Sequence, residues 1–184
     1  HNISNNYRKS YGIFAVSGIL FNHESPLRGE EFVTRKITLG LIKILNNDLK
    51  YLELGNIYAK RDWGYAKEYV EAMWKMLQQK KPDDYVVSTG KTHSIKFFIN
   101  SAVKYLKINT KWVGKGLKER LINLENNKVI IKINPKLFRP AEVNVLEGNS
   151  SKAKRILKWK AKTDIKKLIK IMIDEEIKNY KSYS

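Results

Sequence analysis

The chain has 184 residues, 42% of them hydrophobic and 11% aromatic, so it can bury the core of one ordinary domain and does not read as disordered. It contains no cysteine, which excludes disulfides, thiolate metal sites and a cysteine nucleophile. The net charge of +18 is typical of nucleic-acid binding, but the 36 basic residues are seven arginines and 29 lysines spread along the chain, which favours a lysine-rich solvated surface.

The sequence shows no feature of a membrane or secreted protein. No apolar run approaches the roughly 18 residues that a transmembrane helix needs. Residues 1–10 are polar and contain no apolar stretch of the kind found in signal peptides. We therefore expect a soluble cytoplasmic protein with no membrane partner.

The first elements predict a strand that leads into a ligand-binding loop. Residues 2–11 fit the last turns of a helix, and residues 13–21 are a nearly continuous apolar run. Such a run is typical of a strand buried on both faces of a parallel sheet. It ends at the polar residues 22–26, and ligands of open α/β sheets bind at the carboxyl ends of strands. The loop and Arg28 beyond it are therefore site candidates by position.

Helices and strands then alternate along the chain. In order, the spacing predicts a helix over residues 30–46, a short strand over 51–54, a helix from Asp62 to Gln79, a strand over 85–88 and a helix over 95–106. Asp62 and Ser94 are each placed to cap the helix that follows.

The last third of the chain predicts a mostly antiparallel insertion followed by helices. The elements are strands over 111–113 and 128–133 with a turn at 125–127, a short helix over 151–157 and a last helix capped by Asp164. The fold class is therefore α/β. It reads as the end of a Rossmann-type doubly wound parallel sheet plus a smaller α/β substrate-binding domain.

Several signatures of a complete active site are missing. No Gly-x-Gly-x-x-Gly or Walker loop follows a strand, and Gly-x-Ser-x-Gly does not occur. The three histidines show no metal-ligand spacing. No catalytic residue and no metal site are therefore assigned to this chain.

A group of cations suits a sugar nucleotide. Arg35, Lys36, Arg61 and Arg139 stand beside turns or helix starts, where guanidinium forks and an ammonium group can bind a diphosphate. Glu142 is an acceptor suited to ribose hydroxyls, and Asn22 offers a donor and an acceptor to a sugar or base. Taken singly, Arg61 could equally be the solvated neighbour of a helix cap at Asp62, and Arg139 and Glu142 could equally form a local ion pair.

Three blocks are unusual: residues 18–37, residues 54–56 with 59–74, and residues 138–143. Together they resemble the GDP-mannose 4,6-dehydratase family of extended short-chain dehydrogenase/reductases, over nearly the whole chain, and the stretch from Gly18 to Ile37 is the part specific to that family. The resemblance implies a hydro-lyase that converts GDP-mannose to GDP-4-keto-6-deoxymannose, the first step toward GDP-fucose and related deoxyhexoses. It also implies a bound NADP that takes hydride from C4 of the sugar and returns it at C6.

The resemblance covers the C-terminal, sugar-nucleotide-binding portion of the family. The family's glycine-rich NADP loop and its catalytic tyrosine, lysine, threonine and glutamate lie upstream of the matching region. No Tyr-x-x-x-Lys stands before the predicted strand over 13–21. We therefore expect this chain to be the substrate-binding part, inactive alone and with an incomplete coenzyme site.

Matching positions imply roles for individual residues. His23 and Arg28 match family residues that contact NADP. The GDP-sugar side matches Asn22, Val33, Lys36, Arg61, Arg139 and Glu142, together with Arg35 and Gly55. Leu27 departs from the family, which has an arginine there, and this affects a loop that reaches neighbouring subunits in the family's homo-oligomers.

Two other interpretations stay open. A related GDP- or dTDP-sugar reductase or epimerase would share the fold, although such relatives carry Asn-x-x-Gly-Pro where this chain has Asn22-His23-Glu24-Ser25-Pro26. A basic nucleic-acid-binding module would place stacked aromatic side chains beside arginines on one face.

Overall fold

The computed structural model describes residues 1–138, 141 and 143–183, without the side chains of the last three of these. The chain divides into two compact units that alternate along the sequence. Unit 1 comprises residues 1–24, 61–92 and 146–164, and unit 2 comprises residues 25–60, 93–145 and 165–184. Short strands β4 (Lys60–Arg61), β7 (His93–Ser94) and β11 (Val145–Leu146) fall where the chain changes unit.

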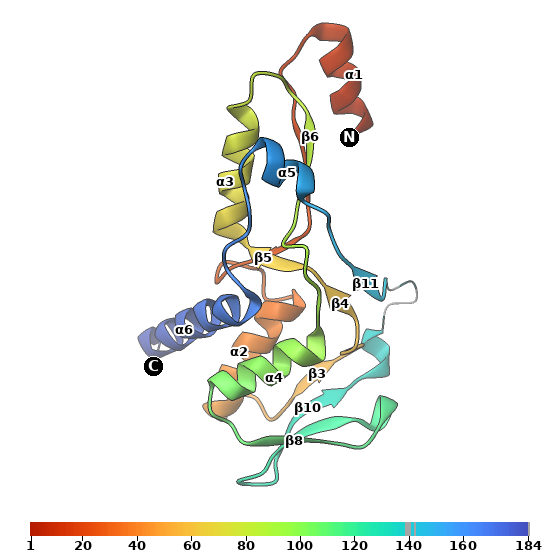
Figure 1. The fold of residues 1–184 in the computed structure, drawn as a ribbon. Helices are drawn as coiled ribbons and strands as arrows, with labels where there is room; N and C mark the ends of the chain where they lie inside the picture. Colours follow the sequence, from red (N-terminus) through yellow and green to blue (C-terminus); the bar gives the residue numbers. More distant parts are fainter. Residues whose placement is uncertain (139–140, 142, 184) are drawn as a thin grey trace. The chain divides into compact units, whose positions relative to one another are not determined.

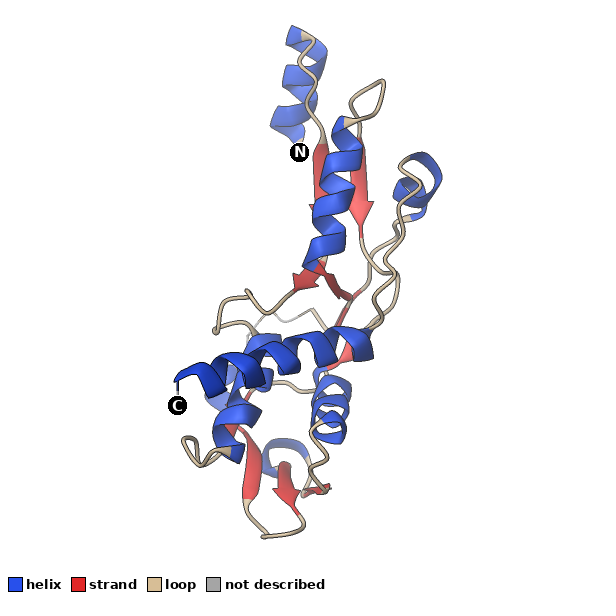
Figure 2. Cartoon of the chain, turned by 90° about the vertical axis from the view of Figure 1, so that its left-hand side faces the viewer, coloured by secondary structure: helices blue, strands red, loops and turns tan. Residues whose placement is uncertain are grey.

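Unit 1 is built from parallel strand pairs and helices (Figures 1 and 2). Strand β1 (Ser17–Leu20) pairs with β6 (Asp84–Val87), and β2 (Asn22–Glu24) pairs with β5 (Trp63–Tyr65), both in parallel. The helices of this unit are α1 (Asn2–Tyr11), α3 (Ala66–Leu77) and α5 (Ser151–Ile156). Parallel pairing in a βαβ context is what the predicted Rossmann-type fold requires.

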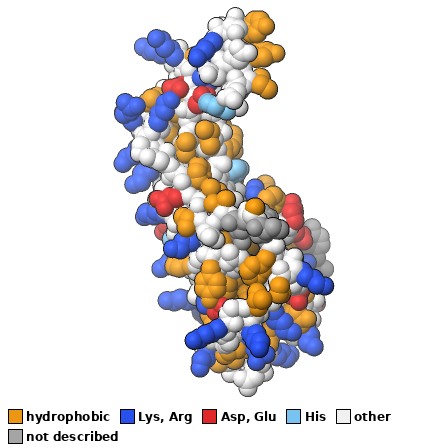
Figure 3. Space-filling model, turned by 90° about the vertical axis from the view of Figure 1, so that its right-hand side faces the viewer, with side chains coloured by type: hydrophobic (Ala, Val, Ile, Leu, Met, Phe, Trp, Pro, Cys, Tyr) orange, Lys and Arg blue, Asp and Glu red, His pale blue; other side chains and the backbone are white. Residues whose placement is uncertain are grey.

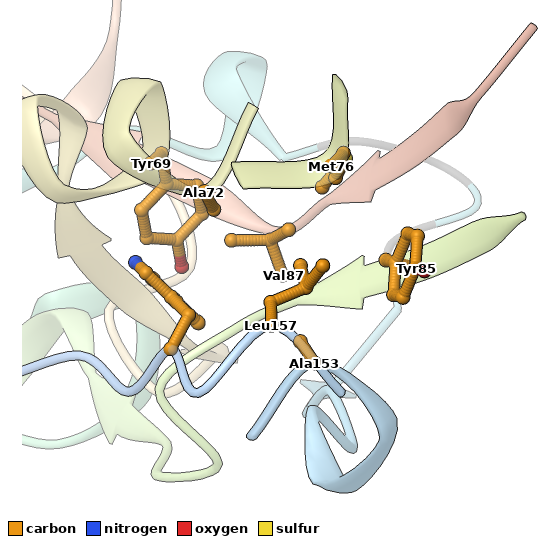
Figure 4. Packing of buried hydrophobic residues seen from close by; sticks show 8 residues of the cluster. Tyr69, Ala72, Met76, Tyr85, Val87, Ala153 and Leu157 are labelled. Atoms are coloured by element: carbon orange, nitrogen blue, oxygen red, sulfur yellow. The ribbon is translucent and has the colours of Figure 1, made fainter. Parts of the chain in front are cut away.

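The core of unit 1 lies between α3, β6 and α5. Figure 4 shows Tyr69, Ala72 and Met76 of α3 facing Tyr85 and Val87 of β6, with α5 contributing apolar side chains. The spacing of the three α3 residues places them on one face of the helix. Burying this face is what holds α3 against the strands.

Unit 2 combines a mixed sheet with three helices. Its strands β3 (Leu52–Leu54), β8 (Thr110–Val113), β9 (Arg120–Asn123) and β10 (Val129–Ile133) run in the order β3-β10-β9-β8. β3 is parallel to β10, whereas β9 is antiparallel to both β10 and β8. Helices α2 (Val33–Leu45), α4 (Ile95–Tyr105) and α6 (Ile165–Tyr183) pack against one another, and 3-10 turns lie at Gly116–Lys118 and Pro135–Leu137.

The prediction of a strand buried on both faces over 13–21 is wrong in part. The structure has β1 at Ser17–Leu20 and a second strand, β2, where a polar loop is predicted. Ile13, Phe14 and Ile19 are 47%, 42% and 47% exposed. Burial on both faces needs helices on both sides of a sheet and a neighbour on each edge, and β1 pairs only with β6 in the described part of the chain.

Candidate functional site

The site residues predicted from the sequence lie in both units. Unit 1 holds Asn22, His23 and Arg61, and unit 2 holds Arg28, Val33, Arg35, Lys36 and Gly55. Arg139 and Glu142 lie outside the described residues.

In unit 1, strand pairing joins the first two sequence blocks. Asn22 of β2 is the register partner of Trp63 on β5, and His23 is the partner of Gly64. Arg61 lies two residues before Trp63. The parallel pairing therefore brings Asn22 and His23 alongside the segment that begins with Arg61.

The imidazole of His23 is held on two sides. Its Nδ1 lies 2.9 Å from the carbonyl oxygen of Phe21, and its ring stacks on Tyr69 with centroids 5.1 Å apart and planes 28° apart. A neutral ring that donates Nδ1–H to this carbonyl presents Nε2 as an acceptor, and a protonated ring presents it as a donor. His23 is thus an oriented polar group rather than a mobile one.

Tyr69 supports that ring from the core. Its side chain is fully buried, and its hydroxyl makes no hydrogen bond to any part of the chain that the structure describes. Burial raises the pKa of Tyr69, and the charges of Asp62, Glu68 and Glu24 raise it further. The phenol therefore stays neutral and contributes a flat apolar surface beneath His23.

The prediction that Asp62 caps a helix is wrong. The residues after it form β5, and α3 begins only at Ala66. Asp62 is fully buried, and its carboxylate accepts hydrogen bonds from Thr89 N and Oγ1 at 2.9 and 2.6 Å and from Gly90 N at 2.8 Å. Buried carboxylates need such donors, so Asp62 fixes the loop after β6 beside Arg61.

In unit 2, the N-terminus of α2 carries Val33 and Lys36. Its N-cap is Phe32, which offers no side-chain hydrogen bond, and its first turn holds no acidic residue. Lys36 forms no ion pair with any carboxylate that the structure describes. The positive end of a 13-residue helix beside an ammonium group is an environment that favours anions.

Arg35 is engaged within the fold. Its Nε donates to Glu176 Oε1 at 2.9 Å, and its Nη1 donates to the carbonyl oxygen of Arg28 at 2.6 Å. Glu176 comes from α6 and is 4% exposed. Arg35 therefore ties the start of α2 to α6 and to the loop that carries Arg28.

Arg28 lies over an aromatic ring. Its guanidinium carbon is 3.5 Å from the centroid of Phe32. This cation–π contact holds the guanidinium against the ring of Phe32. A guanidinium is a group that binds phosphate oxygens.

Gly55 has a steric reason to be glycine. A Cβ atom at this position would lie 2.5 Å from the carbonyl oxygen of Leu137. Any larger residue would push apart the end of β3 and the turn at Pro135–Leu137. The residue identity is thus explained by a close backbone approach.

Sequence reasoning missed Glu176 and the support that Tyr69 gives to His23. Glu176 follows Met172 and Ile173 of α6 at helical spacing, so it continues the buried stripe of that helix. An acid on an apolar stripe is a signal for a buried ion pair, but the sequence cannot name its partner. Tyr69 likewise falls in an ordinary helical pattern.

The described residues contain no grouping of metal ligands and no helix that could span a membrane. Within residues 1–138, 141 and 143–183, no group of three potential metal ligands comes together. None of the helices there is both long and apolar enough to cross a bilayer.

Sequence comparisons link the chain to one family. The family profile described as GDP-mannose 4,6 dehydratase matches residues 1–172. The GDP-mannose 4,6 dehydratase of Drosophila melanogaster is 50% identical over 174 residues, which is 94% of this chain and 44% of that protein. The Dictyostelium discoideum enzyme of the same name is 49% identical, covering 96% of this chain and 50% of the relative. The chain thus spans about half the length of the curated relatives it matches.

Solved structures share the fold at low sequence identity. RMD from Pseudomonas aeruginosa, complexed with NADPH, has a TM-score of 0.75 at 15% identity, covering 95% of this chain and 52% of that one. The dTDP-glucose 4,6-dehydratase of Bacillus anthracis, in complex with NAD, also has a TM-score of 0.75 at 15% identity, over 98% and 50% of the two chains. These likenesses establish a Rossmann-type α/β fold.

Proposed function

This chain belongs to the GDP-mannose 4,6-dehydratase family, and from that premise we propose that it is the sugar-nucleotide-binding part of an enzyme that dehydrates GDP-mannose. The product would be GDP-4-keto-6-deoxymannose. The observation that carries the proposal is Lys36, unpaired with any described carboxylate, at the uncapped N-terminus of α2, in a chain half identical to a GDP-mannose 4,6 dehydratase.

The substrate roles follow the chemistry of each group. Lys36 and the amides at the start of α2 would bind diphosphate oxygens through charge and the helix dipole. Arg61 would add a guanidinium fork, as Arg139 would, and Glu142 would accept from ribose hydroxyls. Asn22 would contact the sugar or the base, and Val33 would pack against the ligand.

Two of the predicted site residues, Arg35 and Gly55, do not contact the substrate in this proposal. Arg35 is a positioning residue, because its Nε and Nη1 already donate to Glu176 and to the carbonyl oxygen of Arg28. Gly55 acts by absence of a side chain, which lets the end of β3 approach Leu137. Both would support the site without binding the diphosphate.

In this proposal the chain holds only part of the coenzyme-binding site. The Nε2 of His23 and the guanidinium of Arg28 would each contact phosphate groups of a nicotinamide dinucleotide. The sequence holds no Gly-x-Gly-x-x-Gly loop to cradle its pyrophosphate. When bound, NADP would supply reversible hydride transfer, and we assign no catalytic residue of this chain to that chemistry.

The same proposal extends to the coenzyme, the assembly and the location of the protein. We propose NADP as the coenzyme, a homo-oligomer as the assembly and the cytoplasm as the location. Since no catalytic group is assigned within these 184 residues, we propose that the chain alone does not turn over GDP-mannose.

A pair of lysines on one helix tests the substrate site. We expect Lys36→Ala to weaken GDP binding roughly tenfold, because a charge-assisted contact to phosphate is lost. Lys43→Ala is the matched control, since Lys43 lies in the last turn of the same helix, away from the positive end. Binding is measured by NMR titration of the labelled chain with GDP, which detects millimolar affinity.

Two results would contradict the proposed diphosphate site. If Lys36→Ala and Lys43→Ala bind GDP equally well, or if GDP moves no amide signal in the first turn of α2, the diphosphate does not bind there.

A further inference from the structure

A cavity of about 660 Å³ lies at the opposite end of α2 from Lys36. Its walls come from the last turn of α2, the segment before β3, the loop after α4, the end of β9 with the turn that follows it, and strand β10. All of these belong to unit 2. The helix has 13 residues and is therefore about 20 Å long, so this cavity is separate from the proposed diphosphate site.

One part of the cavity is apolar. Ile44, Leu45, Leu49, Ile108 and Ile130 supply aliphatic surface from four different segments. A volume of this size is within the range of small-molecule sites in proteins. The aliphatic surface suits the body of an organic molecule rather than a bare ion.

The charged part is entirely cationic. Lys50, Lys128 and Lys132 line the cavity, and no acidic residue among those the structure describes does so. None of the three forms an ion pair with a described carboxylate, and Lys132 instead lies 3.8 Å from the ring centroid of Tyr51. The nearby acid Glu53 accepts from Asn134 Nδ2 at 2.8 Å. Three like charges around one concavity create a field that attracts anions.

The helix dipole does not cancel this field. The C-terminus of a helix is its negative end and would oppose an anion. Here the exposed carbonyls are already occupied, because Ile42 O accepts from Asn46 N and Lys43 O accepts from Asp48 N and Leu49 N. Ile44 O accepts from Asn47 N in the same turn.

We propose that this cavity is a second binding site, for a small organic anion: a carboxylate, sulfonate or phosphate on an aryl or short acyl body. The aliphatic wall takes the body, and the lysines take the charge. The site does not depend on the proposed GDP-sugar function, and it is contained within one unit.

The test uses 8-anilinonaphthalene-1-sulfonate, an aryl sulfonate, and N-phenyl-1-naphthylamine, which lacks the sulfonate. Binding to the full chain is followed by fluorescence titration. Lys50 and Lys128 are both exposed, so Lys50→Glu/Lys128→Glu should fold normally, as checked by circular dichroism. We expect the double variant to bind the sulfonate at least about tenfold more weakly and the neutral amine equally well.

Two further variants separate this site from other surfaces. Lys166→Glu, on exposed α6 surface of the same unit, makes the same charge change per residue and should leave sulfonate binding within about twofold. Leu45→Trp fills the cavity from its exposed rim and should weaken both dyes. The proposal is overturned if the wild-type chain does not bind the sulfonate, or if Lys166→Glu weakens it as much as the double variant. Unchanged binding in both the double variant and Leu45→Trp would overturn it as well.

Discussion

The ion pair between Arg35 and Glu176 is the residue-scale contact with the largest expected effect. Glu176 is nearly fully buried, so its removal leaves a guanidinium in a poorly solvated place. We expect Glu176→Ala to lower the free energy of unfolding by about 3 kcal/mol. Urea denaturation measures the change.

Glu175→Ala is the control for this prediction. Glu175 is 39% exposed at its side chain and lies 3.7 Å from Lys178, so its loss should change stability by less than about 0.5 kcal/mol. Equal effects of the two substitutions would mean that the Arg35 pair contributes no more than a surface contact.

For single residues, the sequence predicts the chemical type of a site residue better than it predicts which residues that side chain contacts. It identifies Arg35 as a cation at a helix start, but only the folded chain brings Glu176 from α6 to meet it. It places Asp62 beside a helix, but the donors that satisfy its carboxylate come from Thr89 and Gly90 on another loop. Partners separated by long stretches of chain are set by tertiary packing, which no local pattern contains.

At the scale of elements, α3 presents an apolar face to solvent. Val70, Trp74 and Leu77 are 60%, 61% and 56% exposed, and their spacing places them on one stripe, opposite the buried Tyr69 and Ala72. Exposed apolar stripes of this kind mark surfaces that associate. We therefore expect the chain to self-associate through α3 as its concentration rises.

Sedimentation velocity tests this expectation. The sedimentation coefficient of the wild-type chain should rise with concentration, and Val70→Gln/Trp74→Gln should abolish the rise. Lys67→Gln, which changes an exposed polar residue of the same helix, should not. A wild-type chain that stays monomeric at all concentrations would contradict the prediction.

A second element-scale contact predicts a pH dependence. Glu119 accepts hydrogen bonds from Tyr58 and Lys96, which links α4 to the segment before β9. Burial alone would raise the pKa of Glu119, but the hydrogen bonds and the charge of Lys96 outweigh it and hold the pKa below its ordinary value. For Lys96, burial acts to lower the pKa, and the bonds to Glu119 and Tyr58 raise it overall.

The direction of each pKa shift sets the pH range in which that group stabilises the fold. A depressed Glu119 pKa stabilises the fold above its unfolded value of about 4.3, and this is lost as the pH falls through the folded pKa. A raised Lys96 pKa stabilises below about 10.4 and is lost as the pH rises through the folded pKa. The Tm difference between wild type and Glu119→Gln should thus be largest near neutral pH and shrink below about pH 4. A difference that is constant across pH would contradict this account.

Long helices with strongly periodic apolar residues can be predicted from the sequence, whereas short strands are missed. The helices α2, α4 and α6 and the Ser94 cap of α4 are confirmed, since apolar spacing and cap chemistry are local. Strand β9 is missed, because its four residues bury only Leu121 fully and carry no clear alternation. Strand β2 is polar and is held by pairing with β5, a partner that a local pattern does not reveal.

At the scale of the whole molecule, the net charge of +18 is not by itself evidence for a nucleic-acid-binding face. Lysine and arginine side chains are scattered over the visible surface rather than gathered in one stripe (Figure 3). Trp63 and Trp159 are buried, so two of the four tryptophans are not available to stack on bases. The α/β class is predicted from the alternation of helices and strands and the family from motifs, whereas the interleaving of the two units along the chain is not visible in the sequence.

The measurement that tests the central claim most directly is the Tm of the chain with GDP, GDP-mannose, UDP-glucose and a short DNA duplex, at low and moderate salt. The proposed site predicts that both guanosine ligands raise the Tm at both salt concentrations, by about 3 °C or more at ten times Kd, and that UDP-glucose does not. Stabilisation by DNA alone, abolished by salt, would contradict the sugar-nucleotide account and favour the charge as the guide to function. An equal shift with UDP-glucose would contradict the specificity for guanosine.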